Sequence, residues 1–592
     1  MDKSLLKHLL SFVDVSYLTG PILDKELRVS SRRKRNYVLR SIYIILLLLI
    51  IVLFWMEMVR YGGMNLYQAS RMSEAGKGIV YIIIWFQFIV SQVLAIVMLS
   101  TAISDEIYHK TLGVLMTTPI NSFQIVLGKL FSKLLQLLLL LAVSLPLLAV
   151  VRIFGGIPWD YIIKSLCITL SMVIFVGSVS MFFSIFCRRA YTVVIISILT
   201  LGVIFLLLPI LCLMYSEITH SSTRLLETFF TNFHPYISLG FLTAVMMEPA
   251  IRGGPVFSWP ASCISLLVAS VCILTASVIL VRKVALRQIT GQLDLIFVRK
   301  RRVLKDNISK ASSRIRKVSN LPLLWKEMHS PLLGRHKKIV LFCIAASLII
   351  LLLTYLFLLS EHSLDDWEAH MMYSIICLSL GMLFTLVIPA TAITSEKEAG
   401  TWLLLLTTTQ SDWQIIWAKF VGVVRRVLPA WFFLFGHLIL FTLVGWINPA
   451  TVVFMTTIVV WVIIFLSSTG LYFSSRFRKT TTAVIMNFAL AAFLWAFVPF
   501  LIALFGVITR DGEKFFEKYI DIIPFVQTAV VMEANNYSGN LLGTLPDHFS
   551  WPHGSEGIEG TFILMQSIMI VYLLAAFLFL WRAKRCLRKR IF

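Results

Sequence analysis

The feature that most constrains this chain is a series of apolar runs, each about as long as a membrane-spanning helix. A helix needs about 20 mostly apolar residues to cross the roughly 30 Å hydrocarbon core of a bilayer. Hydrophobic residues make up 58% of the 592 residues and charged residues only 14%, against roughly 45–50% and 25% in soluble domains. We therefore expect an all-α polytopic membrane protein with about twelve spans. They lie at roughly 38–58, 78–101, 126–151, 161–186, 191–215, 260–281, 339–359, 371–393, 419–446, 450–474, 482–508 and 561–581.

The distribution of charge predicts the orientation. The net charge of +23 raises the question of nucleic acid, but the basic residues gather beside the apolar runs. The linker 282–338 holds sixteen Lys/Arg and three Asp/Glu, whereas 509–559 holds eight acids and three bases. By the positive-inside rule, both termini and the linker face the cytoplasm, and the loops 216–258 and 509–559 are external. We expect an inner (plasma) membrane protein that contacts lipid and no nucleic acid, with no metal site, since the eight cysteines show no paired spacing.

The chain contains an internal repeat. The segment "TAISDEIYHKTLGVLMTTPINSFQIVLGK" at 101–129 and "TAITSEKEAGTWLLLLTTTQSDWQIIWAK" at 391–419 are identical at eleven of 29 positions. "PILDKEL" from Pro21 parallels "PLLWKEM" from Pro322, and "MFFSIFCRRAYTVVI" from Met181 parallels "LYFSSRFRKTTTAVI" from Leu471. Each half has an even number of predicted spans, so both insert the same way up. We expect two parallel six-helix repeats, 1–305 and 306–592.

Each copy of the longer segment lies between the second and third spans of its half, on the predicted cytoplasmic side. Apolar residues recur at near-helical spacing in the first copy, which favours a short amphipathic helix against the membrane; they are Ile103, Ile107, Leu112 and Leu115. Pro119 is expected to end this helix, and Gly400 to loosen the second copy. Lys129 and Lys419 open the next spans as interface anchors, where long stems let the ammonium group snorkel to water.

The pattern of a Glu, a Gly-Thr pair, Leu/Thr-rich residues and a Lys that opens the next span resembles the permease subunit of ABC type-2 exporters. "SEKEAGTWLLLLTTT" is close to that family's motif, while "SDEIYHKTLGVLMTTP" lacks the Gly and keeps the Thr and the Thr-Thr-Pro. Residues 21–37 and 321–338 resemble the family's amphipathic elbow helices. Their matching charged pairs are Lys25-Glu26 and Lys326-Glu327.

The resemblance implies that residues 102–124 and 392–414 are coupling helices, each docking in a groove of an ATPase subunit, so that two copies serve two subunits. The contact residues it implies are Asp105, Glu106, Thr111, Thr118, Pro119, Glu396, Glu398, Gly400 and Thr401. The chain has no G-x-x-x-x-G-K-[ST] loop and no soluble stretch of roughly 100–200 residues for a nucleotide-binding domain. We therefore expect a permease that is not itself an enzyme and binds no cofactor directly. ATP and Mg²⁺ belong to a separate ABC ATPase that drives export.

Two other functions remain open. A twelve-span secondary transporter also has parallel halves, but it needs buried charges, and the spans hold few beyond Glu57, Arg425 and Arg426, with His437 deeper. A membrane-embedded transferase needs a catalytic carboxylate or base on a loop. Its one candidate is "EHSLDDWEAH" at 361–370, which the predicted topology makes a solvated external loop.

Overall fold

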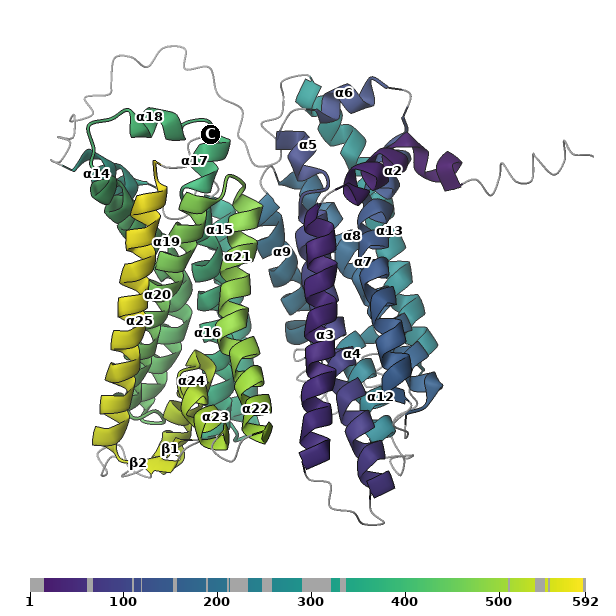
Figure 1. Ribbon diagram of the computed structural model, residues 1–592. Coiled ribbons are helices and arrows are strands. Elements are labelled where there is room, and N and C mark those ends of the chain that lie inside the picture. The colour runs from purple at the N-terminus through teal and green to yellow at the C-terminus, as the bar shows by residue number, and fades with distance from the viewer. Residues whose placement is uncertain are drawn as a thin grey trace, which may run out of the picture. The chain divides into compact units, whose positions relative to one another are not determined.

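A computed structural model gives the arrangement of the chain as two compact units, Met1–Val303 and Leu304–Phe592. Each is a bundle of helices (Figure 1). The residues that it describes are 15–32, 34–60, 68–108, 111–118, 120–152, 157–187, 190–209, 212, 233–247, 258–289, 321–330, 337–508, 512–537, 549–551 and 554–588.

The first unit begins with a helix in the predicted elbow, followed by the long helices of the bundle. Its elements are α2 (Val15–Ser31), α3 (Lys34–Arg60), α4 (Gln68–Ser100), α5 (Ser104–Tyr108), α6 (Leu112–Met116), α7 (Ser122–Arg152), α8 (Trp159–Phe186), α9 (Ala190–Gly202), the π-helical turn η1 (Val203–Leu207), α12 (Pro235–Met247) and α13 (Trp259–Ile289). In this bundle α8 packs against both α4 and α13, and α2 packs along α7.

The second unit repeats this order, and the structure describes further elements before its last helix. Its elements are α14 (Pro322–His329), α15 (Lys337–Ser360), α16 (Trp367–Thr391), α17 (Thr394–Glu398), α18 (Trp402–Leu406), α19 (Asp412–Val444), α20 (Pro449–Arg476), α21 (Thr480–Ala492), the π-helical turn η2 (Phe493–Phe497), α22 (Val498–Ile508), α23 (Gly512–Ile520), α24 (Pro524–Glu533), the 3-10 turn η3 (Ala534–Tyr537), β1 (Phe549–Trp551), β2 (Gly554–Glu556) and α25 (Ile558–Cys586). Here α20 packs against α16 and α25, as α8 does against α4 and α13.

The expected all-α membrane fold is confirmed. Within the described ranges, ten helices are long and apolar enough to cross a membrane. The other two predicted spans are helices as well, α3 and α15, whose described apolar parts are shorter, Arg40–Leu49 and Ile344–Ser360. The two predicted external loops are not simple loops. The first holds α12, and the second holds α23, α24 and the antiparallel hairpin β1–β2.

Local sequence signals set the ends of the long helices. Ser411 accepts a hydrogen bond from the Gln414 N–H, and the Gln414 side chain accepts one from the Ser411 N–H, so a capping box starts α19. Asn448 caps α20, whose first residue is Pro449. Gly445 ends α19 in the left-handed conformation, at a φ of 94°.

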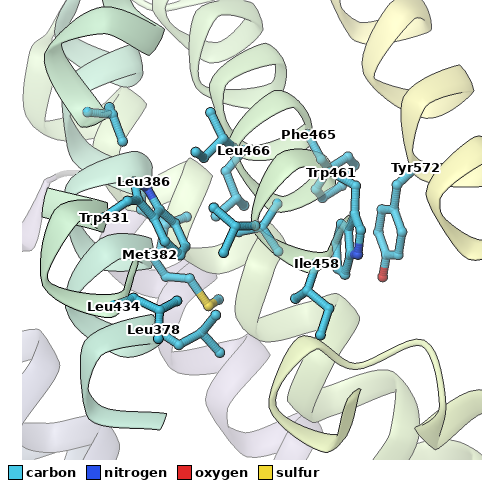
Figure 2. Packing of buried hydrophobic residues seen from close by; sticks show 14 of the residues in the cluster. Leu378, Met382, Leu386, Trp431, Leu434, Ile458, Trp461, Phe465, Leu466 and Tyr572 are labelled. Atoms are coloured by element: carbon cyan, nitrogen blue, oxygen red, sulfur yellow. The ribbon is translucent and has the colours of Figure 1, made fainter. Parts of the chain in front are cut away.

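The core of the second unit is built from large rings and from glycines that let helices approach. Trp461 of α20 stacks on Tyr572 of α25, with ring centroids 4.0 Å apart (Figure 2). Trp431 of α19 lies against Gly381 of α16, where an added Cβ would stand 2.7 Å from the indole, and its N–H donates to Thr385. Small residues facing neighbours in this way are typical of packed membrane helices.

Candidate coupling site

The repeated segment forms two short helices in each unit rather than the one expected amphipathic helix. They are α5 and α6 in the first unit and α17 and α18 in the second. In each unit one backbone hydrogen bond links the residue before the second short helix to the first. The N–H of Thr111 donates to the carbonyl of Glu106, and that of Thr401 to the carbonyl of Glu396, both at 3.0 Å. Gly400 supplies the turn in the second unit at a φ of +71°, a conformation that glycine adopts without strain.

In the second unit the segment is centred on a buried lysine. The ammonium group of Lys419 in α19 lies 2.6 Å from a carboxylate oxygen of Glu396 and 2.7 Å from one of Glu327. Glu396 belongs to α17 and Glu327 to the elbow helix α14. One cation therefore joins three elements: the elbow, the coupling segment and the next span. Figure 1 shows α14, α17 and α18 at the same end of this unit.

Two arginines complete the cluster. Arg426 lies 2.6 Å from the other oxygen of Glu327, and Arg425 donates to backbone carbonyls of α14 and Ser330. Burial on its own raises the pKa of Glu327, but the charges and hydrogen bonds of Lys419 and Arg426 outweigh it and hold that pKa below its ordinary value. Gly422 lets α14 approach, since a Cβ there would lie 2.8 Å from the Glu327 Cβ.

The first unit has a smaller version of this cluster. The Lys129 ammonium donates to Glu106 at 2.8 Å and to the carbonyl of Ala102 at 2.7 Å. The elbow glutamate, Glu26, lies 3.7 Å from Lys133. In this unit two lysines therefore hold the two elements: Lys133 pairs with the elbow and Lys129 with the coupling segment. In the second unit the single Lys419 pairs with both.

Lys129 and Lys419 do not behave as the expected interface anchors. Their residues are only 6% and 4% exposed, and their ammonium groups point into the ion pairs described above. A buried ammonium without partners would be costly, whereas one that donates to carboxylates is satisfied. The stems therefore do not snorkel to water, and both lysines hold the coupling segments in place.

The outward faces of α6 and α18 are apolar. Leu112 and Trp402 occupy equivalent positions and are buried, which fixes each short helix to its bundle. Val114 and Leu404, again equivalent, are 66% and 70% exposed, and Leu403 beside the latter is exposed too. The helices α6 and α18 lie at the end of each unit that carries the elbow helix, beyond the long apolar helices (Figure 1).

Comparison with known proteins identifies one region of the chain. Residues 339–582 match the family model described as ABC-2 family transporter protein. The second unit carries an ABC-2 transporter region. No curated protein matches the chain, and no solved structure does. The matched range holds α15 to α25, including the second coupling segment, and supports a permease component of an ABC transporter in a multi-pass membrane protein.

The remaining predicted contact residues differ in their surroundings. In the ABC-2 region, Glu398 accepts hydrogen bonds from Thr480, and Thr401 is exposed. In the first unit, Asp105 is half-buried and Thr111 and Thr118 are exposed, with the Thr111 hydroxyl donating to the Glu106 carboxylate. Pro119 lies outside the described residues. The contact of these residues with a partner remains a prediction.

The predicted elbow residues also take different places. Lys25 is exposed, and Lys326 lies 3.9 Å from Glu396 with most of its side chain in solvent. Sequence reasoning missed the apolar outward residues Val114 and Leu404. Their signal was present: both are apolar, stand 290 residues apart and come two positions after a larger apolar residue, Leu112 or Trp402.

Of the ten residues in "EHSLDDWEAH", Leu364 and His370 are buried in the bundle. The His370 ring lies 5.4 Å from that of His437, whose Nδ1 is 2.6 Å from the Tyr355 hydroxyl. Asp365 and Glu368 are exposed, and no group of three potential metal ligands occurs among the residues that the structure describes. His437 is thus a helix-packing residue that bonds Tyr355 of α15.

Proposed function

We propose that this chain is the transmembrane permease of an ABC exporter, driven by two ABC ATPase subunits that are separate polypeptides. The proposal combines the ABC-2 transporter region with the duplicated coupling segments. Each segment receives one ATPase subunit. ATP and Mg²⁺ bind to those subunits, and the permease binds no cofactor itself. In the proposed orientation the chain lies in the inner membrane, and both termini and both segments face the cytoplasm.

The observation that carries the proposal is the exposed apolar face of the two short helices. Leucines in the spans can face lipid, but Val114 and Leu404 lie on short segments outside the long helices. Exposed apolar side chains on short helices outside the spans are typical of protein contacts. The ion pairs of Lys129 and Lys419 give each face a fixed position, so a partner can bind it without ordering a loop.

In this mechanism the ATPase subunits close on ATP and carry the coupling segments with them. The movement reaches the spans through α7 and α19, to which the two segments are joined by Lys129 and Lys419. Energy for transport then comes from the difference in partner affinity between two states of the permease.

Native mass spectrometry of the chain, co-expressed with the ABC ATPase encoded nearest to it, tests the proposal. We expect one permease with two ATPase copies. Leu404→Asp should weaken ATPase binding by about thirtyfold, since burying a leucine contributes about 2 kcal/mol. Ser360→Asp adds the same charge at the end of α15 and is the control. A secondary transporter would bind no ATPase, and a complex with one ATPase per permease would contradict the two-segment assignment.

A further inference from the structure

Two adjacent charged residues of α17 fasten it to the turn between α20 and α21. The Lys397 ammonium donates to the carbonyls of Ser474 and Phe477, each at 3.1 Å, and to that of Ser475. These carbonyls belong to the last turn of α20 and the residue after it, where a helix leaves its carbonyls without intrahelical partners. Lys397 therefore caps α20 from another element.

Glu398 caps the start of the next helix, α21, whereas Lys397 caps the end of α20. α21 begins at Thr480, and the side chain of its N-cap residue, Lys479, makes no capping hydrogen bond. The Thr480 N–H donates instead to the Glu398 carboxylate at 2.7 Å, and the Thr480 hydroxyl donates to the same oxygen at 3.0 Å. A cation at the end of one helix and an anion at the start of the next both agree with the helix dipoles.

The backbone of α17 is held at the same place. The hydroxyl oxygen of Ser474 accepts hydrogen bonds from the N–H groups of Ile393 and Thr394, both at 2.9 Å. α17 follows α16 in the chain, yet these polar contacts are made to α20 and α21. Its position is therefore tied to the turn between those two helices.

The first unit lacks the two charged residues of this joint at the equivalent positions. At the offset of 290 residues, Ile107 and Tyr108 stand where the second unit has Lys397 and Glu398. Neither carries a charge at neutral pH, so neither can supply the cation or the anion that caps the two helices. The two coupling segments therefore differ in what they are attached to.

We propose that Lys397 and Glu398 are positioning residues that join the second coupling segment to the α20–α21 turn and pass its movement to that turn. This inference rests on the proposed function, because the movement is imposed by an ATPase. It adds that the two segments are not equivalent. The second delivers movement to the α20–α21 turn as well as to α19, whereas the first lacks the two charged residues and has Ile107 and Tyr108 at the equivalent positions.

The ionisation of Lys397 gives the joint a measurable property. Burial lowers the pKa of Lys397 to about 8; Cys586 at the end of α25 raises it, and Arg478 in the turn lowers it further. Among the described residues, Cys586 and Arg478 are the ionisable groups that shift the pKa of Lys397, whereas the carboxylate of the neighbouring Glu398 accepts from Thr480. The charge is therefore partly lost as the pH passes 8, and the joint weakens. An arginine at this position keeps its charge.

Hydrogen exchange of the purified permease–ATPase complex tests the joint, without nucleotide and with ATP and vanadate. In the variants Lys397→Met and Glu398→Ala we expect the amide hydrogens of residues 477–484 to exchange at least about tenfold faster than in the wild type. This is the effect expected when a charge-assisted hydrogen bond is lost. The ATP-induced change in exchange of α21 should fall below half of the wild-type value. Lys479→Met removes an exposed charge from the same turn and is the control.

A pH profile separates this role from a merely structural one. The ATPase rate of the wild-type complex, divided by that of Lys397→Arg, should fall by about tenfold between pH 7 and pH 9, because the charged fraction of a lysine with a pKa of about 8 falls about tenfold over that range. Parallel profiles, or a wild-type response of α21 in Lys397→Met, would overturn the proposal. If no ATPase binds the permease, both this proposal and the proposed function fail. Exchange of 477–484 in the permease alone still shows whether the joint exists.

Discussion

Replacing Lys419 by methionine removes the cation that joins the elbow, the coupling segment and α19, and keeps the length of the side chain. Two charged hydrogen bonds are lost, of 2.6 and 2.7 Å, each contributing about 1.5–3 kcal/mol. Breaking a buried ion pair costs about 3–5 kcal/mol. Glu327 keeps Arg426, which moderates the penalty, so we expect a loss of about 3–4 kcal/mol in the stability of the second unit.

The equivalent substitution in the first unit, Lys129→Met, should reduce stability less. Lys129→Met removes one carboxylate contact and one carbonyl contact, and the partly exposed Glu106 can be hydrated in return. We expect about 1–2 kcal/mol. Thermal unfolding of the detergent-solubilised chain, followed by tryptophan fluorescence, measures both variants. An equal or larger effect of Lys129→Met would refute the reasoning that the shared lysine is the stronger joint.

Two further predictions concern the same site. Glu327→Gln should lower the melting temperature at neutral pH. The pKa of Glu327 is lower in the folded protein than its ordinary value of 4.5. The extra stability of the wild type over Glu327→Gln is therefore complete above pH 4.5, and it should vanish as the pH falls through the folded-state pKa. Gly400→Ala should cost about 1 kcal/mol and speed proteolysis between α17 and α18, with Gly400→Asn less harmful, because only the φ of +71° opposes a side chain there.

The sequence was a good guide to the spans, because their signal is local. An apolar run of sufficient length has to be a helix in a bilayer, and caps such as Ser411 and Asn448 mark where helices begin. The repeat at an offset of 290 also placed the coupling segments between the correct helices. These inferences need no knowledge of which side chains meet.

The sequence was a poor guide to what each charged residue contacts, because that depends on packing between distant elements. Lys419 was expected at the membrane surface, but α14 brings Glu327 to it from 92 residues away. The π-helical turns η1 and η2, again 290 residues apart, had no signal in the apolar pattern. The short helices α12 and α24 did have a sequence signal that was not used. Their ends carry similar residues, "AVMME" at 244–248 and "AVVME" at 529–533.

The carboxylates of Glu106 and Glu396 point into their own units, and this affects how docking at α6 and α18 would depend on salt and temperature. Glu106 and Glu396 are paired inside their units, whereas Val114 and Leu404 are 66% and 70% exposed, so a partner that docks there would meet apolar side chains. Association through such a surface lowers the heat capacity and is little screened by ions. A complex held in this way withstands a rise in salt, yet it loosens on cooling, because the hydrophobic driving force fades at low temperature.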